Sequence, residues 1–186
     1  MKRALLAIVL GVVVGCTKSS SSSKSEPAPA AAPAATASGV AANPAAAPTP
    51  AAAPMAAADL AWHTVDPKAP LAASLASFAT AAKAAGLKPY AYLHATWCGP
   101  CNAIEKFHAA DAKMVDAFKG TAIAMIDIDA ADDKALSAHG LESGSIPVFF
   151  KLDEAGKPTG DKIDGGAWGD NTPDNMAPPL KTFFSK

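Results

Sequence analysis

At residues 95–102 the chain carries the sequence ATWCGPCN, in which Cys98 and Cys101 stand three positions apart. The residues 89–95 form a short apolar run, rich in aromatic side chains, which predicts a buried strand. From Cys101 onward, apolar residues recur at helical spacing. The sequence therefore predicts that Cys98 lies where a strand gives way to the first turn of a helix.

The first turn of a helix favours a negatively charged group. Its unpaired N–H groups and the positive end of the helix dipole stabilise the thiolate of Cys98 over the thiol, and the thiolate is the nucleophile. Pro100 suits this turn, because a missing N–H costs nothing there. Cys101 lies one turn later and is close enough to close a small disulfide ring with Cys98. The dithiol is therefore the candidate chemical site.

Residues 1–15 have the features of a bacterial export signal, with two basic residues before the apolar run 4–14. This run is too short to cross a bilayer as a helix. It ends in VVGC, which resembles a lipobox, the motif in which the cysteine, here Cys16, becomes the lipidated first residue of the mature protein. An ordinary signal peptide or a weak membrane anchor is the alternative. Thr17, which is not an aspartate, favours the outer membrane over the inner one.

Low-complexity sequence follows, as a Ser/Lys tract and then Ala/Pro repeats. Such a composition buries too little apolar surface to offset the entropy of ordering it. We therefore expect residues 16–58, with the lipidated Cys16 at their start, to be a disordered Ser/Ala/Pro-rich linker that tethers a domain to a membrane.

Residues 59–186 are left for one folded domain. They hold 12 lysines and 16 acidic residues, a net charge of −4 without a basic cluster, which argues against nucleic acid as a partner. The chain has three cysteines, one assigned to lipid and two to the motif. A structural disulfide would therefore have to consume the motif itself.

The hydrophobic patterns of this domain predict an α/β fold, a central mixed sheet with helices on both faces. The predicted strands are 60–65, 90–95, 121–128, 145–152 and 162–164. The predicted helices are 70–85, one from Cys101, one capped by Asp111, 131–139 and 180–184. Residues 165–179 are predicted to form a Gly/Asn/Pro-rich loop.

The motif WCGPC after a strand, with Ile146 and Pro147 opening a later strand, resembles the thioredoxin family. The resemblance covers roughly residues 60–186 and implies the thioredoxin fold. The stretch after the motif is similar to the C-terminal domain of the bacterial thiol reductase DsbD. That domain also has an acid four residues after the second cysteine, here Glu105, and an aspartate ten residues after it, here Asp111.

This resemblance implies a role for each residue of the site. Cys98 would be the attacking thiolate, and Cys101 would resolve the mixed disulfide, so that the pair alternates between a dithiol and a redox-active disulfide. Trp97 would flank the sulfur and exclude water. Pro147 would be cis and lie opposite the dithiol, and Ile146 would offer backbone groups to an extended substrate.

The chain departs from the family behind the second cysteine. Typical thioredoxins hold a buried aspartate six residues before the first cysteine and a lysine on the next strand; here these positions are Tyr92 and Met125. Glu105, His94 or bulk water would then have to accept the proton of Cys101.

A metal site is the alternative use of these residues. Zinc would need two ligands besides the cysteines, and His94 and His108 are the only candidates nearby. The aspartates of residues 127–133 lack the glycine and glutamate of a calcium loop, so they are assigned to a strand end and a helix cap. We expect no metal and no cofactor. Trp168 could cover the rim of the active site or fill the edge of the core.

These features predict a protein-disulfide reductase that is anchored by lipid in the bacterial cell envelope and faces the periplasm. Gly99 and Pro100, between the cysteines, resemble the reducing members of the family. The expected partners are protein thiols and disulfides, and a membrane electron-donor protein of the DsbD/CcdA type. The alternatives are a non-catalytic adaptor that uses the thioredoxin scaffold to bind a partner, and an envelope disulfide oxidase or isomerase.

Overall fold

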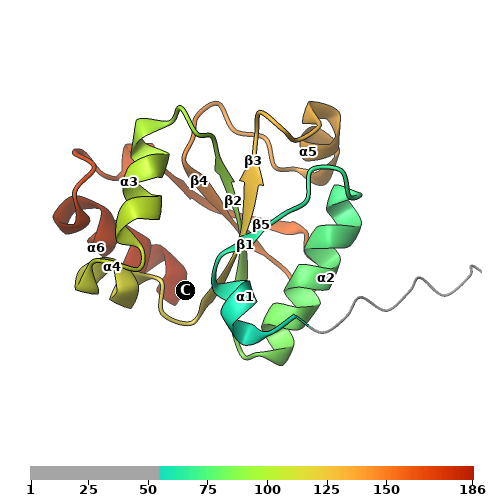
Figure 1. The fold of residues 1–186 in the computed structure, drawn as a ribbon, viewed down its shortest axis with the longest axis horizontal. Coiled ribbons are helices and arrows are strands. Elements are labelled where there is room, and N and C mark those ends of the chain that lie inside the picture. Colours follow the sequence, from blue (N-terminus) through green and yellow to red (C-terminus); the bar gives the residue numbers. More distant parts are fainter. Residues whose placement is uncertain (1–54) are drawn as a thin grey trace, which may run out of the picture. The chain divides into compact units, whose positions relative to one another are not determined.

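The computed structural model describes residues 55–186, which form a sheet covered by helices (Figure 1). The predicted signal peptide at 1–15, the lipidation site Cys16 and most of the linker predicted at 16–58 lie outside the described residues. The strands are β1 (His63–Thr64), β2 (Lys88–His94), β3 (Thr121–Asp127), β4 (Val148–Leu152) and β5 (Pro158–Asp164). The helices are α1 (Ala57–Ala61), α2 (Leu71–Ala84), α3 (Gly99–Phe107), α4 (Ala112–Ala117), α5 (Asp133–His139) and α6 (Pro173–Ser185), with a turn of 3-10 helix at Gly165–Ala167.

The five strands pair in the order β1-β3-β2-β4-β5. β3 runs parallel to both β1 and β2, whereas β4 runs antiparallel to β2 and to β5. Parallel strands need long crossovers, so α2 connects β1 to β2 and the α3–α4 pair connects β2 to its neighbour β3, while β4 and β5 are joined by a tight turn. This mixed sheet with helices on both faces is the predicted fold class, the thioredoxin fold, and the prediction is confirmed.

Alternate residues of β2 serve two cores, one on each face of the sheet. Tyr90 and Tyr92 face the core that α3, α4 and α6 cover. Ala91 and Leu93 face the core that α1, α2 and α5 cover. All four residues are buried. Because both faces of β2 are covered, its sequence is a nearly continuous apolar run rather than an alternation.

The first strand is shorter than predicted. Only His63–Thr64 of the expected strand 60–65 pairs with β3, and Ala57–Ala61 forms helix α1 instead. Alanine has the highest helix propensity, and Leu60 is fully buried from its place in α1. Helix α1 therefore begins before the predicted start of the domain at residue 59.

The last helix is longer than predicted. Helix α6 begins at Pro173, inside the predicted loop 165–179, and continues through Pro178 and Pro179. A proline suits the first helical turn, but two prolines further along predict an end to the helix. The helix persists because one side of it is buried in the core, namely Met176, Ala177, Leu180, Phe183 and Phe184. Tertiary packing here outweighs the two hydrogen bonds that the prolines cannot donate.

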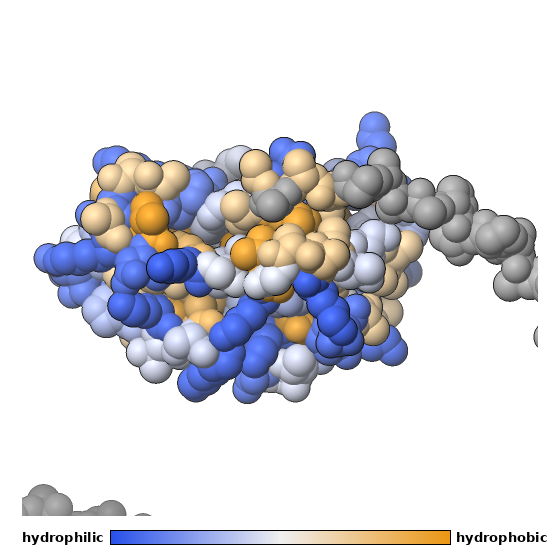
Figure 2. Space-filling view, turned by 90° about the horizontal axis from the view of Figure 1, so that it is seen from below, coloured by the Kyte–Doolittle hydropathy of each residue, from blue (hydrophilic) through white to orange (hydrophobic). Residues whose placement is uncertain are grey.

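The surface of the domain is mixed in character. Figure 2 shows one face, on which hydrophilic side chains surround patches of apolar ones. Ion pairs between Lys113 and Asp174 and between Lys181 and Asp116 link α4 to α6. Within residues 55–186, none of the helices combines the length and the apolar character that crossing a membrane requires.

Candidate active site

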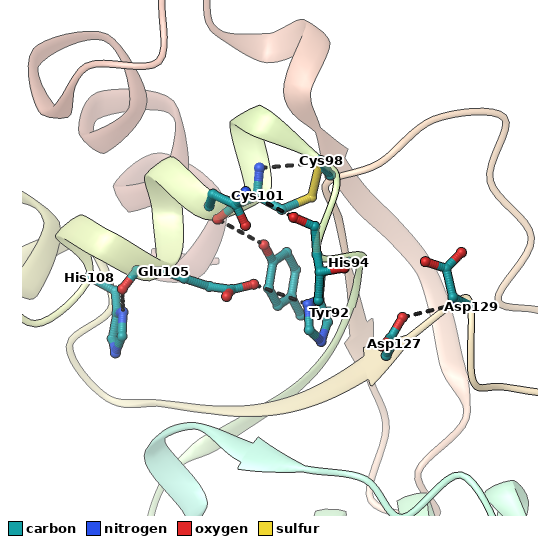
Figure 3. Close-up of polar contacts among 10 residues, drawn as sticks. Tyr92, His94, Cys98, Cys101, Glu105, His108, Asp127 and Asp129 are labelled. Carbon is teal, nitrogen blue, oxygen red and sulfur yellow. Dashed lines mark hydrogen bonds and ion pairs between the residues drawn. A yellow bond between two sulfur atoms is a disulfide. The ribbon is translucent and has the colours of Figure 1, made fainter.

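Cys98 and Cys101 form a disulfide at the start of α3, with an S–S distance of 2.07 Å (Figure 3). β2 ends at His94 and α3 begins at Gly99, so the predicted passage from strand to helix is confirmed. Cys98 is the N-cap residue, and its Sγ accepts the backbone N–H of Cys101 at 3.2 Å. After reduction the same N–H would face a thiolate, and hydrogen bonds to charged acceptors are the stronger ones.

The two cysteines differ in their access to solvent. Cys101 is fully buried, whereas Cys98 retains 4% exposure. Gly99, between them, is exposed, and Pro100 is half-buried in the first turn of α3. Both cysteines are therefore buried, and Cys101 is the more completely enclosed of the two.

Trp97 lies on the rim of the site and is 66% exposed. Its indole N–H donates a hydrogen bond of 2.7 Å to the carboxylate of Asp129, which follows β3. The sequence predicts only a strand end and a helix cap around Asp129, because residues 97 and 129 are far apart in the chain. The pairing of β2 with β3 brings them together.

The Ile146–Pro147 peptide bond is cis, the conformation that the resemblance implies. Pro147 directly precedes β4, whose first residue, Val148, pairs with Leu93 near the end of β2. The carbonyl oxygen of Pro147 accepts the N–H of Gly165 at 3.0 Å. Pro147 and the half-buried Ile146 therefore lie at the end of the sheet from which α3 begins.

Trp168 is buried in the same core as the two cysteines. Its indole N–H donates to the side-chain oxygen of Asn171 at 3.2 Å, and its ring lies close to Gly165. Of the two positions considered for Trp168, the edge of the core is the observed one.

Three polar side chains gather on the inner side of α3, behind the disulfide (Figure 3). Nδ1 of His94 lies 3.0 Å from Oε1 of Glu105. The hydroxyl of Tyr92 lies 3.5 Å from the carbonyl oxygen of Cys101, the long limit for a hydrogen bond. Tyr92 is fully buried, and the side chains of His94 and Glu105 are 12% and 33% exposed. The disulfide thus lies against a polar cluster within a largely apolar core.

The periodicities of two elements bring this cluster together. Tyr92 and His94 are two residues apart in β2 and so point to the same face of the sheet. Cys101 and Glu105 are four residues apart in α3 and so lie on the same side of the helix. Met125 on β3 pairs with Tyr92, at the position where the resemblance implies a lysine in typical thioredoxins.

Tyr92 cannot replace the missing aspartate as a proton acceptor. Burial raises the pKa of Tyr92 far above its ordinary value, and the negative charge of Glu105 raises it further. The hydroxyl therefore keeps its proton at any ordinary pH. Glu105 and His94 are left as the candidate acceptors within the cluster.

His108, the other histidine near α3, does not reach the carboxylate of Glu105. Its Nδ1 lies 2.7 Å from the backbone oxygen of Glu105, and its ring lies against Trp62, with centroids 4.1 Å apart. Within residues 55–186, no three His, Cys, Asp or Glu side chains are grouped so that they could hold a metal ion.

The chain is similar to a solved structure described as the X-ray structure of Fasciola hepatica thioredoxin. The sequence identity is 25%, the match covers 56% of this chain and 83% of that chain, and the TM-score is 0.37. No protein-family model and no curated protein matches the chain. The site itself is a dithiol–disulfide centre. A thioredoxin-like fold that holds a Cys-X-X-Cys pair at the start of a helix supports thiol–disulfide exchange.

Proposed function

We propose that this protein is a membrane-tethered thiol–disulfide oxidoreductase of the bacterial cell envelope, which reduces protein disulfides through Cys98 and Cys101. One observation carries the proposal: Sγ of Cys98 caps α3 and accepts the N–H of Cys101 at 3.2 Å. A thiolate at this position gains a hydrogen bond and the favourable end of the helix dipole. Both favour the nucleophilic form of Cys98.

Reduction proceeds by two exchanges. The thiolate of Cys98 attacks one sulfur of the substrate disulfide, the substrate S–S bond breaks, and the other substrate sulfur leaves as a thiolate that takes up a proton. Cys101 then loses its proton and attacks the sulfur of Cys98, which releases the second substrate sulfur. Two electrons pass to the substrate, and the disulfide between Cys98 and Cys101 forms. The burial of Cys101 suits this second role, because a sulfur that solvent cannot reach reacts best within the protein.

We assign Glu105 as the acceptor of the proton that Cys101 loses. Glu105 lies one helical turn beyond Cys101, and its carboxylate points to the side of α3 where Tyr92 and His94 lie (Figure 3). Its Oε1 is buried and receives no aligned hydrogen bond from the described residues. The carboxylate therefore has acceptor capacity to spare.

Replacing Glu105 by glutamine should slow disulfide exchange by about 10²-fold, the lower range for general-base catalysis, because an amide cannot take the proton. Tyr92→Asp in the Glu105→Gln background should restore part of the rate, since it returns a carboxylate behind Cys101. Stopped-flow exchange on the two single variants and the double variant measures both effects. A Glu105→Gln rate within about twofold of wild type would reject Glu105 as the acceptor.

The proposed direction is reduction, with a membrane protein of the DsbD/CcdA type returning the disulfide to the dithiol. Gly99 and Pro100 resemble the reducing members of the thioredoxin family. We therefore expect a reduction potential nearer to the about −270 mV of thioredoxin than to the about −120 mV of DsbA. Equilibration with glutathione measures it, and a value close to that of DsbA would indicate an oxidase.

Insulin reduction separates the enzyme from a binding module. The full chain with dithiothreitol should precipitate insulin well before dithiothreitol alone, and Cys98→Ser and Cys101→Ser should both fall to the background rate. If wild type and Cys98→Ser precipitate insulin equally slowly, the thioredoxin scaffold serves a non-catalytic adaptor instead.

A further inference from the structure

His94 is the last residue of β2, and its imidazole lies beside the carboxylate of Glu105 (Figure 3). Nδ1 is 3.0 Å from Oε1 of Glu105, and the side chain is 12% exposed. The other ring nitrogen, Nε2, is buried and has no hydrogen-bond partner among the described residues. The polar contact of the ring is therefore directed at Glu105.

Stacked aromatic rings hold the imidazole in this orientation. The ring of His94 lies parallel to that of Tyr92, with centroids 5.2 Å apart and an angle of 12° between the planes. Tyr92 in turn stacks on Phe149 of β4, at 4.5 Å and 10°. The backbone of His94 is fixed as well, because its carbonyl oxygen accepts the N–H of Ile128 at 3.0 Å. Rotating the ring out of this plane would cost its stacking on Tyr92.

The contact suits one tautomer of the ring. Nδ1 of His94 lies 3.0 Å from Oε1 of Glu105 without the alignment of a hydrogen bond, and a proton on Nδ1 would make this contact attractive. A neutral ring with its proton on Nε2 would set two acceptors against each other and would bury an N–H without a partner, which costs free energy. The contact therefore favours the tautomer of His94 that carries its proton on Nδ1, beside the carboxylate.

We propose that His94 is a positioning residue for Glu105, and that its Nδ1–H holds the carboxylate in place to take the proton of Cys101. This inference rests on the proposed function. In the step concerned, the proton of Cys101 passes to Glu105, the sulfur of Cys101 bonds to that of Cys98, and the bond between Cys98 and the substrate sulfur breaks. Both electrons of that bond leave with the substrate sulfur. His94 gives up no proton and no electron in this step.

Ellman's reagent resolves this step in the full chain. In a Cys16→Ser background the only thiols are Cys98 and Cys101, since the chain has three cysteines. Attack by Cys98 releases one coloured thiolate in a phase that accelerates with reagent concentration. Attack by Cys101 on the mixed disulfide releases the second in a phase independent of that concentration. Stopped-flow absorbance therefore measures the two cysteines separately.

Three substitutions separate positioning from packing. His94→Asn places an amide N–H near the position of Nδ1, whereas His94→Gln places it near that of Nε2, away from Glu105. His94→Phe keeps a ring to stack on Tyr92 but removes the donor. His108→Asn is the matched control, because Nδ1 of His108 meets the backbone oxygen of Glu105 and not its carboxylate.

His94→Phe and His94→Gln should slow the second phase about tenfold or more, because a misplaced acceptor loses part of the rate gain of general-base catalysis. The first phase should stay within about twofold of wild type. His94→Asn should recover most of the second-phase rate, and His108→Asn should match wild type in both phases. Circular dichroism identifies the variants that fold. If only one of His94→Phe and His94→Gln folds, that variant alone is compared with His94→Asn.

Two results would overturn the assignment. If every folded His94 variant keeps the second phase within about twofold of wild type, His94 does not position the acceptor. If His94→Phe retains the rate and His94→Asn loses it, the ring matters only through its stacking. Failure of the proposed function looks different, because the wild type would then fail to accelerate insulin reduction, whatever the two phases show.

Discussion

Cys98 and Cys101 stand three residues apart, yet their surroundings divide the chemistry between them. Cys98 caps α3 and keeps a small exposure, so that it can meet a disulfide from outside. Cys101 is fully buried in front of Tyr92 and Glu105. A buried thiol needs an acceptor for its proton before it can attack, since burial disfavours the charged form. The polar cluster behind α3 is therefore as much a part of the site as the two sulfurs.

Tyr92 should make the protein less stable at alkaline pH. Its pKa is raised, chiefly by burial, whereas in the unfolded chain a tyrosine loses its proton near pH 10. Above about pH 10 the unfolded state has therefore bound fewer protons than the folded one, so the free energy of unfolding falls as pH rises. Tyr90 contributes in the same direction, because burial and, to a smaller extent, the charge of Asp161 raise its pKa to about 12.

Urea denaturation between about pH 9 and pH 11 measures this effect, because the window spans the tyrosine pKa of the unfolded chain. The free energy of unfolding of Tyr92→Phe should fall less over this range than that of wild type. Both proteins share their lysines and Tyr90, so the difference between the two slopes reports Tyr92 alone. Equal slopes would show that the hydroxyl of Tyr92 is not held protonated by its surroundings.

Not every residue of the candidate site could be predicted from the sequence. The placement of Cys98 at a helix start and of Asp111 as a cap followed from local patterns, and Asp111 does accept the N–H of Lys113 and of Met114. The contact between His94 and Glu105 could not be predicted from local sequence patterns. Strand and helix periodicities give the face on which each side chain lies, but not the distance between two elements.

The turn between β4 and β5 packs directly on α2. Gly156 in this turn has a φ of +77°, and a Cβ there would lie 2.4 Å from the backbone oxygen of Leu75. Its own carbonyl oxygen lies 2.8 Å from Nε2 of His139. Gly156 thus lets the hairpin approach both α2 and α5.

Gly156→Ala should destabilise the domain more than Gly160→Ala, its matched control. Gly160 also has a positive φ, of +96°, but a Cβ there would meet nothing within 4 Å. Both variants lose about 1–2 kcal/mol from the left-handed backbone. Gly156→Ala should lose about 1–3 kcal/mol more from the overlap with α2. Urea denaturation gives both values, and equal losses would contradict the close approach of hairpin and helix.

Elements with strong patterns are predictable, and those that depend on distant partners are not. β2 and α3 follow from an apolar run and from helical spacing, and both lie where expected. Helix α6 contains two prolines, so local rules end it too early, and only the burial of residues such as Leu180 and Phe184 sustains it. Leu60 and Ala61, predicted to begin a strand, end helix α1 instead, because a short buried apolar segment has the same sequence pattern in either element.

At the scale of the whole molecule, the proposed reductase would be a folded domain on a tether, as the composition of residues 16–58 predicts. The predicted signal at 1–15 and the lipobox at Cys16 lie outside the described residues, so the anchor rests on the sequence pattern. A lipid anchor would keep the domain next to a membrane electron donor and raise its local concentration there.

Cys16→Ala should abolish lipidation and leave the protein either unprocessed or free of the membrane. Detergent-phase partitioning of the wild type and the variant from the native envelope measures this, and Cys101→Ser, which retains Cys16, serves as the control. Identical partitioning of wild type and Cys16→Ala would argue for an ordinary signal peptide or another form of attachment.

The central claim is that Cys98 attacks a disulfide and that Cys101 releases the product. The most direct measurement is to incubate reduced Cys16→Ser/Cys101→Ser protein with insulin and to map the adducts by mass spectrometry. A stable mixed disulfide between Cys98 and an insulin cysteine is the predicted result, with much less adduct in the matched Cys16→Ser/Cys98→Ser protein because Cys101 is buried. The absence of adduct at Cys98, or an equal yield through Cys101 in the matched protein, would contradict the account.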